Sequence, residues 1–212
     1  DARALLVQGQ VVEISYNIQA AVDSKHNLVV ATHTINRNDR NALSSIAMEA
    51  KENLAVDTFT VLVDKGYHNG RELDTCKSKN ITTIVAHPDQ GKSNENGTQP
   101  EYFVSKFTYN KEEDSYTCPQ GKFLKTTGSW HKKTGRTEES GYQFKKYRTP
   151  ECKTCPVKEL CTSRKGGREI DRSQYADAVE ENNERYRQNK DLYRTRQEIN
   201  EHIFGTIKRQ WG

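Results

Sequence analysis

Apolar and polar residues alternate along two short stretches near the beginning of the chain. Residues 11–22 read VVEISYNIQAAV and residues 27–33 read NLVVATH, with a polar turn at residues 23–26 between them. A period of two is typical of strands that bury one face. The pattern therefore predicts a β-hairpin.

A helix and two buried strands are predicted next. Residues 39–54 carry apolar side chains at helical spacing, and we expect Asp39 to cap this helix. The apolar runs at 58–63 and 81–86 indicate buried strands, with a short helix over about 70–79 between them. Strands that alternate with helices predict an α/β domain with a mixed sheet, to which the hairpin supplies the antiparallel part.

The periodic pattern stops after residue 88. A polar, glycine-containing sequence begins at Asp89, and helical spacing resumes only after about residue 172. We therefore expect the first part of an α/β core at 1–88, a polar and basic insertion without an apolar core at 89–171, and C-terminal helices at 172–212 that complete the core.

The composition limits the classes of protein to consider. Only 33% of the 212 residues are hydrophobic and the mean hydropathy is −0.99, so the core must be small for the length. No apolar run approaches the ~18 residues that span a bilayer, and the first residues lack the layout of a signal peptide. These features exclude membrane and secreted classes and favour a cytoplasmic protein. Because the chain begins with Asp1 and Met48 is its only methionine, we expect it to be a fragment.

Charge is unevenly distributed along the chain. Residues 119–165 hold twelve Lys and Arg residues but only four Glu residues, a local charge of +8 against +4 for the whole chain. A basic segment of this kind indicates a surface that binds a polyanion such as DNA. A solvated lysine-rich loop is the alternative.

Four of the five cysteines fall within the insertion: Cys118, Cys152, Cys155 and Cys161. Four thiolates can close a tetrahedral structural zinc site, and a polar insertion needs such a link. An iron–sulfur cluster and four reduced thiols are the alternatives, and His131 could replace one cysteine. Cys76 lies apart in a predicted helix, where we expect a small buried residue.

Candidate carboxylates follow two of the predicted strands. Asp64 comes directly after the apolar run TFTVLV, and Gly66 lets the chain turn away. Asp23 stands in the same relation to the strand that ends at Val22. Ligands of α/β proteins bind at such strand ends, so the two carboxylates are expected at one edge of the sheet. Each, taken alone, could instead be an ordinary turn residue.

A third carboxylate lies in the C-terminal segment. Residues seven apart on a helix are only about 20° out of line, so Arg194, Glu201 and Lys208 share one stripe if a single helix continues past Gly205. Glu201 is followed by His202, Ile203 and Phe204, so the segment is not a simple exposed face.

The runs LVDKGYHNG around Asp64 and YRTRQEINEHIFGTIKRQWG at the C-terminus resemble bacterial insertion-sequence transposases of the DDE class with the YREK signature. The resemblance covers essentially the whole chain, which would be the C-terminal catalytic portion. It implies an RNase H-like fold in which three carboxylates bind two Mg²⁺ or Mn²⁺ ions, and a DNA-cutting and DNA-joining activity in the bacterial cytoplasm.

The resemblance assigns the three acidic residues. Asp64 matches the second and Glu201 the third. The first lies on the first strand of the hairpin, where Asp23 is the carboxylate at the strand end, and Asp1 is the alternative. These three residues would be both catalytic and ligands of magnesium.

The resemblance also assigns residues that hold DNA phosphates. Tyr193, Arg196 and Lys208 match the signature, but four residues separate Arg196 from Glu201 where three are usual, and Gln197 occupies the expected arginine position. The expected DNA-binding residues are Tyr193, Arg194, Arg196, Lys208, Lys145, Lys146 and Arg148.

The expected function is that of a DNA transposase. It would cut double-stranded DNA at transposon ends by metal-dependent hydrolysis and join the strand to target DNA by transesterification, as a homo-oligomer on DNA. Two alternatives stay open: a transposase remnant that binds DNA without cutting it, and a related nuclease that does not join strands.

Overall fold

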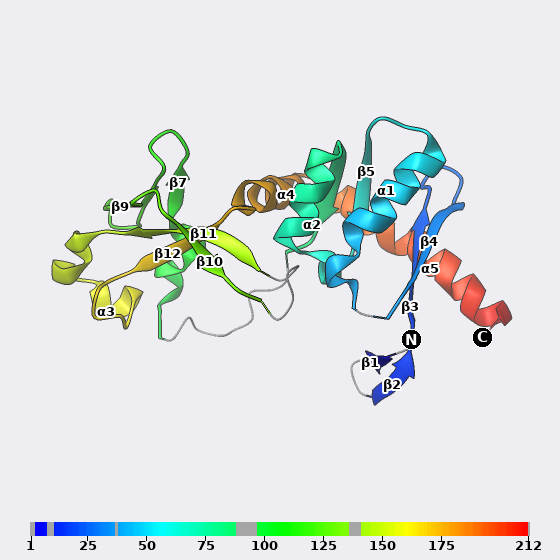
Figure 1. The fold of residues 1–212 in the computed structure, drawn as a ribbon, viewed down its shortest axis with the longest axis horizontal. Coiled ribbons are helices and arrows are strands. Elements are labelled where there is room, and N and C mark those ends of the chain that lie inside the picture. Colours follow the sequence, from blue (N-terminus) through cyan, green and yellow to red (C-terminus); the bar gives the residue numbers. More distant parts are fainter. Residues whose placement is uncertain (1–2, 8–10, 37, 88–96, 136–140, 212) are drawn as a thin grey trace. The chain divides into compact units, whose positions relative to one another are not determined.

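The computed structural model describes residues 3–7, 11–36, 38–87, 97–135 and 141–211 (Figure 1). The chain divides into two compact units, one formed by Asp1–Pro88 together with Asp177–Gly212 and the other by Asp89–Ala176. The first unit is therefore built from two stretches that the second unit separates in the sequence. No helix in the described ranges is both long and apolar enough to cross a bilayer.

The first unit contains strands, helices and two 3-10 turns. They are β1 (Arg3–Val7), β2 (Val11–Ser15), β3 (Asn17–Val22), β4 (Val29–Ile35), η1 (Asp39–Asn41), α1 (Leu43–Leu54), β5 (Phe59–Val63), η2 (Lys65–Tyr67), α2 (Gly70–Ser78), β6 (Ile81–Val85), α4 (Ala176–Gln188) and α5 (Lys190–Trp211). The mixed α/β class that the sequence predicts is confirmed.

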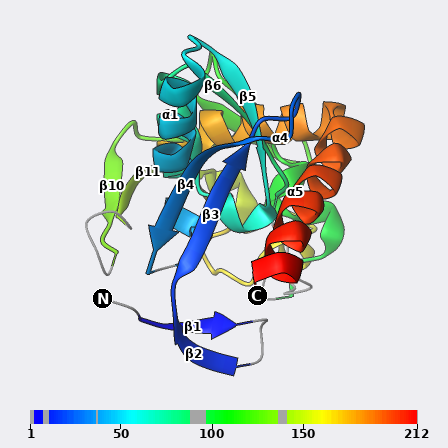
Figure 2. The ribbon, with the colours of Figure 1, turned by 90° about the vertical axis from the view of Figure 1, so that its right-hand side faces the viewer.

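The strands of this unit pair two by two. β1 and β2 are antiparallel, as are β3 and β4, whereas β5 and β6 are parallel. Figure 2 shows the β1–β2 hairpin beside the beginning of β3. The prediction of one strand over residues 11–22 is wrong, because the apolar residues 3–7 form a separate partner for β2, and the chain passes into β3 at Tyr16.

Helix α1 packs against two of the strand pairs, β3–β4 and β5–β6. Leu43, Ala47 and residues of α2 and β6 form one buried cluster, while Ile46 and Ala50 pack with Ala31 of β4 in another. α1 therefore buries the apolar face that the sequence predicts, except at its last residue, Leu54, which is exposed.

Helix α4 closes the outer edge of β6 through side chains. The buried Asn182 amide donates to the carbonyl oxygen of Val85 (2.9 Å) and accepts from its N–H (3.0 Å). Arg185 Nε donates to the carbonyl oxygen of Thr83 (3.0 Å). Buried backbone groups need hydrogen-bond partners, so α4 takes the place of a further strand along this edge.

The second unit is an antiparallel sheet with short helical turns. Its elements are η3 (Pro100–Tyr102), η4 (Val104–Lys106), β7 (Thr108–Asn110), β8 (Ser115–Thr117), β9 (Phe123–Lys125), β10 (Trp130–Lys133), β11 (Tyr142–Arg148), η6 (Pro150–Thr154), α3 (Lys158–Cys161) and β12 (Glu169–Ser173). The strand order is β10-β11-β9-β8-β7, and β12 also pairs with β11.

This unit has an apolar core, contrary to the prediction. Leu124 and Tyr147 are fully buried and pack with Phe107, Tyr116 and Ile170. Its strands have three to seven residues, so the alternation within each one is too short to stand out from the polar sequence around it.

Candidate active site at the end of strand β5

Asp64 follows β5 directly and begins the turn η2. Its Oδ1 accepts a hydrogen bond from the backbone N–H of Lys65 (2.7 Å), so the carboxylate caps the turn. The side chain nevertheless remains 60% exposed. The carboxylate is fixed at the end of an apolar strand and still open to a ligand.

Helix α5 brings two predicted residues to this strand end. The Tyr193 hydroxyl donates to the carbonyl oxygen of Val63 (3.0 Å), the residue before Asp64. Arg196 Nη2 lies 3.9 Å from Asp64 Oδ1, and its guanidinium carbon lies 5.1 Å from the centre of the Tyr193 ring. The arginine beside Asp64 is therefore Arg196. Gln197, which holds the position where the signature has its arginine, is exposed.

The electrostatics keep Tyr193 protonated. Burial raises the pKa of Tyr193, the charge of Arg196 lowers it, and the charge of Asp64 raises it, with a rise as the net result. A protonated phenol remains a hydrogen-bond donor to Val63, which anchors α5 at the end of β5.

A second carboxylate at this site is Asp39. Its Oδ1 accepts hydrogen bonds from the side-chain amides of Asn17 (2.5 Å) and Gln19 (3.2 Å), both on β3. The expectation that Asp39 caps the following helix is wrong, because α1 begins only at Leu43 and the side chain of Asn38 caps the intervening turn η1.

Asp64 begins the turn η2, and Asp39 lies next to Gly66 of the same turn. A Cβ added at Gly66 would lie 3.4 Å from Asp39 Oδ2, so the glycine lets the two chain segments approach closely. Burial raises the pKa of Tyr67, and the charges of Asp39 and Asp64 raise it further. The two carboxylates therefore share the surroundings of one phenol.

Asp23 lies at the opposite end of β3. Its Oδ2 accepts from the backbone N–H of His26 (2.8 Å) and lies 2.9 Å from Nδ1 of the same residue, and the backbone hydrogen bond lowers the pKa of Asp23. Asn17, which binds Asp39, begins this six-residue strand. At about 3.3 Å per residue, the strand separates Asp23 from that end by roughly 20 Å.

The structure thus does not bring Asp23 together with Asp64. The sequence-based prediction assumed that the strands ending at Val22 and Val63 run in the same direction. In the structure, the beginning of β3 at Asn17, and not its end at Val22, lies beside Asp39. Asp1, the alternative first carboxylate, lies outside the described residues.

Glu201 is exposed on α5. It follows Arg196 by five residues, which places it about 140° around the helix from Arg196. α5 continues past Gly205 to Trp211, so Arg194 and Glu201 share one stripe of the helix, as expected. Arg194 Nη1 lies 3.3 Å from Asp191 Oδ1. Lys208 is on the last turns of this helix, and its side chain lies outside the described part.

The donor set at Asp39 and Asp64 suits a hard divalent cation, since Mg²⁺ and Mn²⁺ prefer carboxylate oxygens. Within the described part of the chain, no three Cys, His, Asp or Glu side chains are close enough to hold one ion together. The site therefore offers two carboxylates, with Glu201 as the further candidate on the adjoining helix.

Sequence reasoning missed the residues that hold Asp39. Gln19 is a buried amide within an otherwise apolar strand, and such a residue requires a polar partner. Asp39 is a carboxylate in the polar turn NDRN that comes shortly after a strand. The buried amide and the carboxylate in the following turn could together have indicated the hydrogen bond between Gln19 and Asp39.

Two of the basic residues expected to bind DNA are paired closely with carboxylates of the second unit. Lys145 Nζ lies 2.6 Å from Asp114, and Lys146 Nζ lies 2.9 Å from Glu169. Arg148 is 4.0 Å from Glu169 and its side chain is 64% exposed. Of these three expected DNA-binding residues, Arg148 has the most accessible charge.

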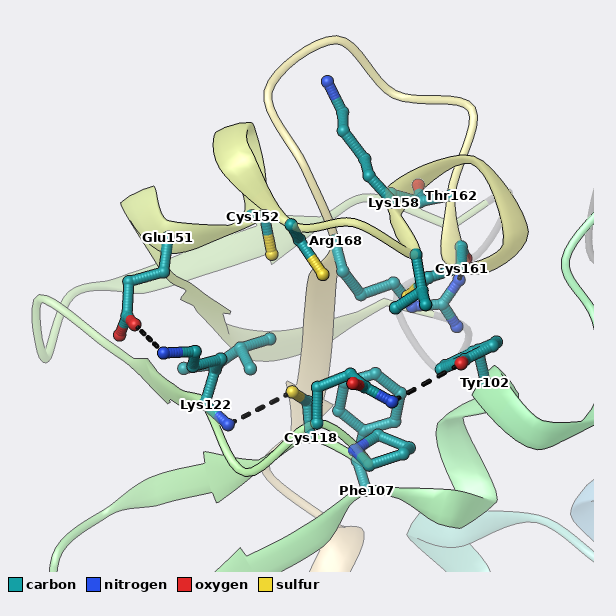
Figure 3. A pocket seen from close by; sticks show the side chains of 15 residues that line it. Tyr102, Phe107, Cys118, Lys122, Glu151, Cys152, Lys158, Cys161, Thr162 and Arg168 are labelled. Atoms are coloured by element: carbon teal, nitrogen blue, oxygen red, sulfur yellow. Dashed lines mark hydrogen bonds and ion pairs between the residues drawn. The ribbon is translucent and has the colours of Figure 1, made fainter.

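The five cysteines are free thiols and fall in two places. Cys76 is fully buried in the core of the first unit, as expected, and burial raises its pKa to about 12. The other four line one small cavity of the second unit (Figure 3).

Comparison with known proteins bears on the C-terminal part of the chain. Residues 117–212 match the family model described as Transposase DDE domain. No curated protein and no solved structure matches the chain. The matched range includes α5, whose Tyr193 and Arg196 reach the end of β5. The match, together with the mixed α/β fold, supports a DDE transposase.

Proposed function

We propose that the chain is the catalytic portion of a DNA transposase with an RNase H-like core, similar to the YREK branch of bacterial insertion-sequence enzymes. The observation that carries the proposal is the contact between Asp64 Oδ1 and Arg196 Nη2 (3.9 Å). The second unit separates these two residues in the sequence. A carboxylate beside an arginine at the end of an apolar strand suits metal-assisted chemistry on a phosphate.

Two of the proposed acidic ligands are anchored by hydrogen bonds and the third is exposed on a helix. Asp64 and Asp39 are anchored, by a backbone N–H and by two side-chain amides respectively. Glu201, exposed on α5, is the third ligand in this proposal. Asp39 thereby takes the role that sequence reasoning gave to Asp23. Bound Mg²⁺ or Mn²⁺ ions would supply an activated water or 3′-hydroxyl and neutralise charge on the leaving oxygen.

Arg196 has the features of a phosphate ligand. Its side chain is only 15% exposed, stacks on Tyr193 and keeps a buried Nε without a hydrogen-bond partner in the described part of the chain. A guanidinium can bind a phosphate through two N–H groups at once, which positions the scissile bond beside the carboxylates. Arg194 and Lys208, which lie on the Glu201 stripe of the same helix, are the further phosphate ligands in this proposal.

The proposed reaction has two stages on double-stranded DNA, in the bacterial cytoplasm and within a homo-oligomer. Hydrolysis at the transposon end first releases a 3′-hydroxyl. Transesterification then joins that hydroxyl to target DNA, with the target strand's bridging oxygen as leaving group. The chain's own contribution is to hold both DNA segments and orient them at Asp39 and Asp64.

Analysis of the DNA products tests this proposal. The full chain is incubated with supercoiled plasmid and Mn²⁺, with and without an oligonucleotide that carries a free 3′-hydroxyl. We expect nicked plasmid and plasmid joined to the oligonucleotide. Nicking without joined product would instead identify a nuclease, and a gel shift without nicking would identify a non-catalytic DNA-binding protein.

A further inference from the structure

The four cysteines of the second unit converge from three separate segments. Cys118 follows β8, Cys152 and Cys155 belong to the turn η6 and its end, and Cys161 ends α3. All four line one cavity of about 30 Å³. A space of this size holds one or two particles as large as a water molecule, so its ligand would be an ion rather than an organic molecule.

We propose that this cavity binds one structural Zn²⁺ through Cys118, Cys152, Cys155 and Cys161. Four soft sulfur donors select zinc over the hard cations that carboxylates bind. Four protein ligands also leave no open position for water, which makes the ion structural. This assignment is independent of the proposed function, because the carboxylates at β5 belong to the first unit.

The turn after Cys118 has the geometry of a metal-binding loop. The carbonyl oxygen of Cys118 accepts from the N–H of Gly121 (2.8 Å), and its N–H donates to the carbonyl oxygen of Lys122 (2.9 Å). Gly121 has φ +72°, which a glycine adopts without strain. The backbone N–H of Lys122 points at Cys118 Sγ (3.3 Å), so the turn holds this sulfur against its own backbone.

The second turn holds two cysteines three positions apart. The N–H of Cys155 lies 3.4 Å from the carbonyl oxygen of Cys152, which closes the turn between them. Gly167 packs directly against Cys152, because a Cβ added there would lie only 2.3 Å from Cys152 Cβ. Gly167 also has φ +94°, so no other residue suits this position. The position of Cys152 therefore depends on a glycine outside its own turn.

The charge around the cavity is suited to a zinc–thiolate centre. Zn²⁺ with four thiolates carries a net charge of −2, and Lys158 and Arg168 line the same cavity, together with Lys122, which pairs with Glu151 (2.7 Å). Figure 3 shows the Cys118 and Cys152 side chains pointing into the space between them. As placed, the described sulfurs do not stand at ligating distances, so they must close on the ion as it binds.

The ion would join the turn after β8 to the segment that contains η6 and α3. The core beneath is small, with Phe107, Tyr116, Leu124, Tyr147 and Ile170 as its buried residues. Cys118 and Cys161 pack against that core, so the cavity lies at its margin. Removal of the metal should therefore loosen this margin while the first unit stays folded.

Metal analysis of the full chain, purified without chelator and with reductant present, tests the proposal. We expect about one zinc per chain, on the basis of one four-ligand site. Replacement of zinc by Co²⁺ should give thiolate-to-cobalt charge-transfer absorption. Cys155→Ser and Gly167→Ala should each lower the zinc content, while the control Cys76→Ala, in the first unit, should retain it.

A second measurement covers variants that fail to fold. Chelation of the wild-type chain should increase protease cleavage within residues 118–161, and Zn²⁺ but not Mg²⁺ should reverse the effect. The proposal is overturned if wild-type protein reconstituted with Zn²⁺ binds none, if Cys155→Ser keeps the full stoichiometry, or if the sulfurs hold iron instead. Asp64→Asn should leave the zinc content unchanged, so failure here is distinct from failure of the transposase proposal.

Discussion

Asp39 is held by two amide side chains, and this arrangement distinguishes it from the other candidate carboxylates of the first unit. Asn17 and Gln19 fix its Oδ1, whereas Asp23 accepts hydrogen bonds within its own turn. Hydrogen-bond donors that orient a carboxylate prepare it to bind a metal, and Tyr67 is a further hydrogen-bond partner of Asp39. At the scale of single residues, we therefore propose Asp39 as the partner of Asp64.

Exchange of each carboxylate for its amide tests this pairing. Asp39→Asn should lower Mn²⁺-dependent DNA nicking on the order of a hundredfold or more, because the ion then has one carboxylate ligand fewer. Asp23→Asn should keep nearly full activity. Nicking rates on supercoiled plasmid measure both effects, and a severe loss for Asp23→Asn with little effect at Asp39 would restore Asp23 as the first carboxylate.

The sequence singled out Asp64 and Arg196 as candidates, which the structure brings within 3.9 Å of each other, because each lies in a distinctive run of residues. It was insufficient for Asp39, because the role of this residue depends on how β3 is directed relative to β5. A pattern of alternating side chains shows that a strand exists but not which of its ends approaches another strand.

The edge of β6 provides a test at the scale of elements. Asn182 is fully buried and forms two hydrogen bonds with the backbone of Val85. Asn182→Ala would leave a buried N–H and a buried carbonyl unpaired, so the free energy of unfolding should fall by about 2–4 kcal/mol. Urea unfolding of the full chain measures the loss. The exposed Glu184→Ala on the same helix is the control, and an equal loss there would contradict this role of Asn182.

The turn between β7 and β8 makes the second unit sensitive to acid. The Asp114 carboxylate accepts from the hydroxyls of Tyr109 (2.8 Å) and Tyr147 (2.5 Å) and pairs with Lys145. Burial opposes its ionisation, but these hydrogen bonds outweigh burial and hold the pKa of Asp114 at about 2.

Because the pKa of Asp114 is lower when folded than the ~3.9 of an unfolded Asp, the carboxylate stabilises the fold at neutral pH. This contribution should be lost as the pH falls from about 4 to about 2. Thermal unfolding across that range, followed by tyrosine near-UV circular dichroism, should show a weaker pH dependence for Asp114→Asn. The exposed Asp171→Asn should behave as the wild type, and an unchanged profile for Asp114→Asn would refute the argument.

The elements themselves were predicted unevenly. Long or continuous apolar patterns at α1, β5 and β6 gave the right type of structure, because burial of one face dominates there. The strands β7, β8 and β9 have three residues each and went unrecognised, since their stability comes from cross-strand pairs and from the tyrosines packed between them.

The whole molecule depends on a chain that leaves the first unit after β6 and returns as α4 and α5. The contact between Asp64 and Arg196 therefore joins the two stretches of the first unit, which the second unit separates in the sequence. Apolar periodicity alone cannot predict this return, because the periods of α4 and α5 do not specify which strands the helices will contact.

The exposed and the paired basic side chains of the second unit predict how DNA binding responds to salt. Removal of one side chain that neutralises a phosphate should reduce the slope of log K against log salt by about one. Arg148→Gln should show that reduction, because the charge of Arg148 is exposed. Lys145→Gln and Lys146→Gln should change the slope less, because Asp114 and Glu169 already neutralise both lysines. Lys25→Gln, in the turn of the first unit, is the control, and an unchanged slope for Arg148→Gln would exclude it from the interface.

The central claim is that the end of β5 is a divalent-metal site built on Asp64 and Asp39. Titration of the full chain with Mn²⁺, followed by the loss of the free-ion signal in electron paramagnetic resonance, tests it most directly. We expect wild-type protein and the exposed control Asp57→Asn to bind Mn²⁺ with similar affinity, and Asp64→Asn and Asp39→Asn to bind on the order of tenfold or more weakly. Equal Mn²⁺ affinity in all four proteins would contradict the account.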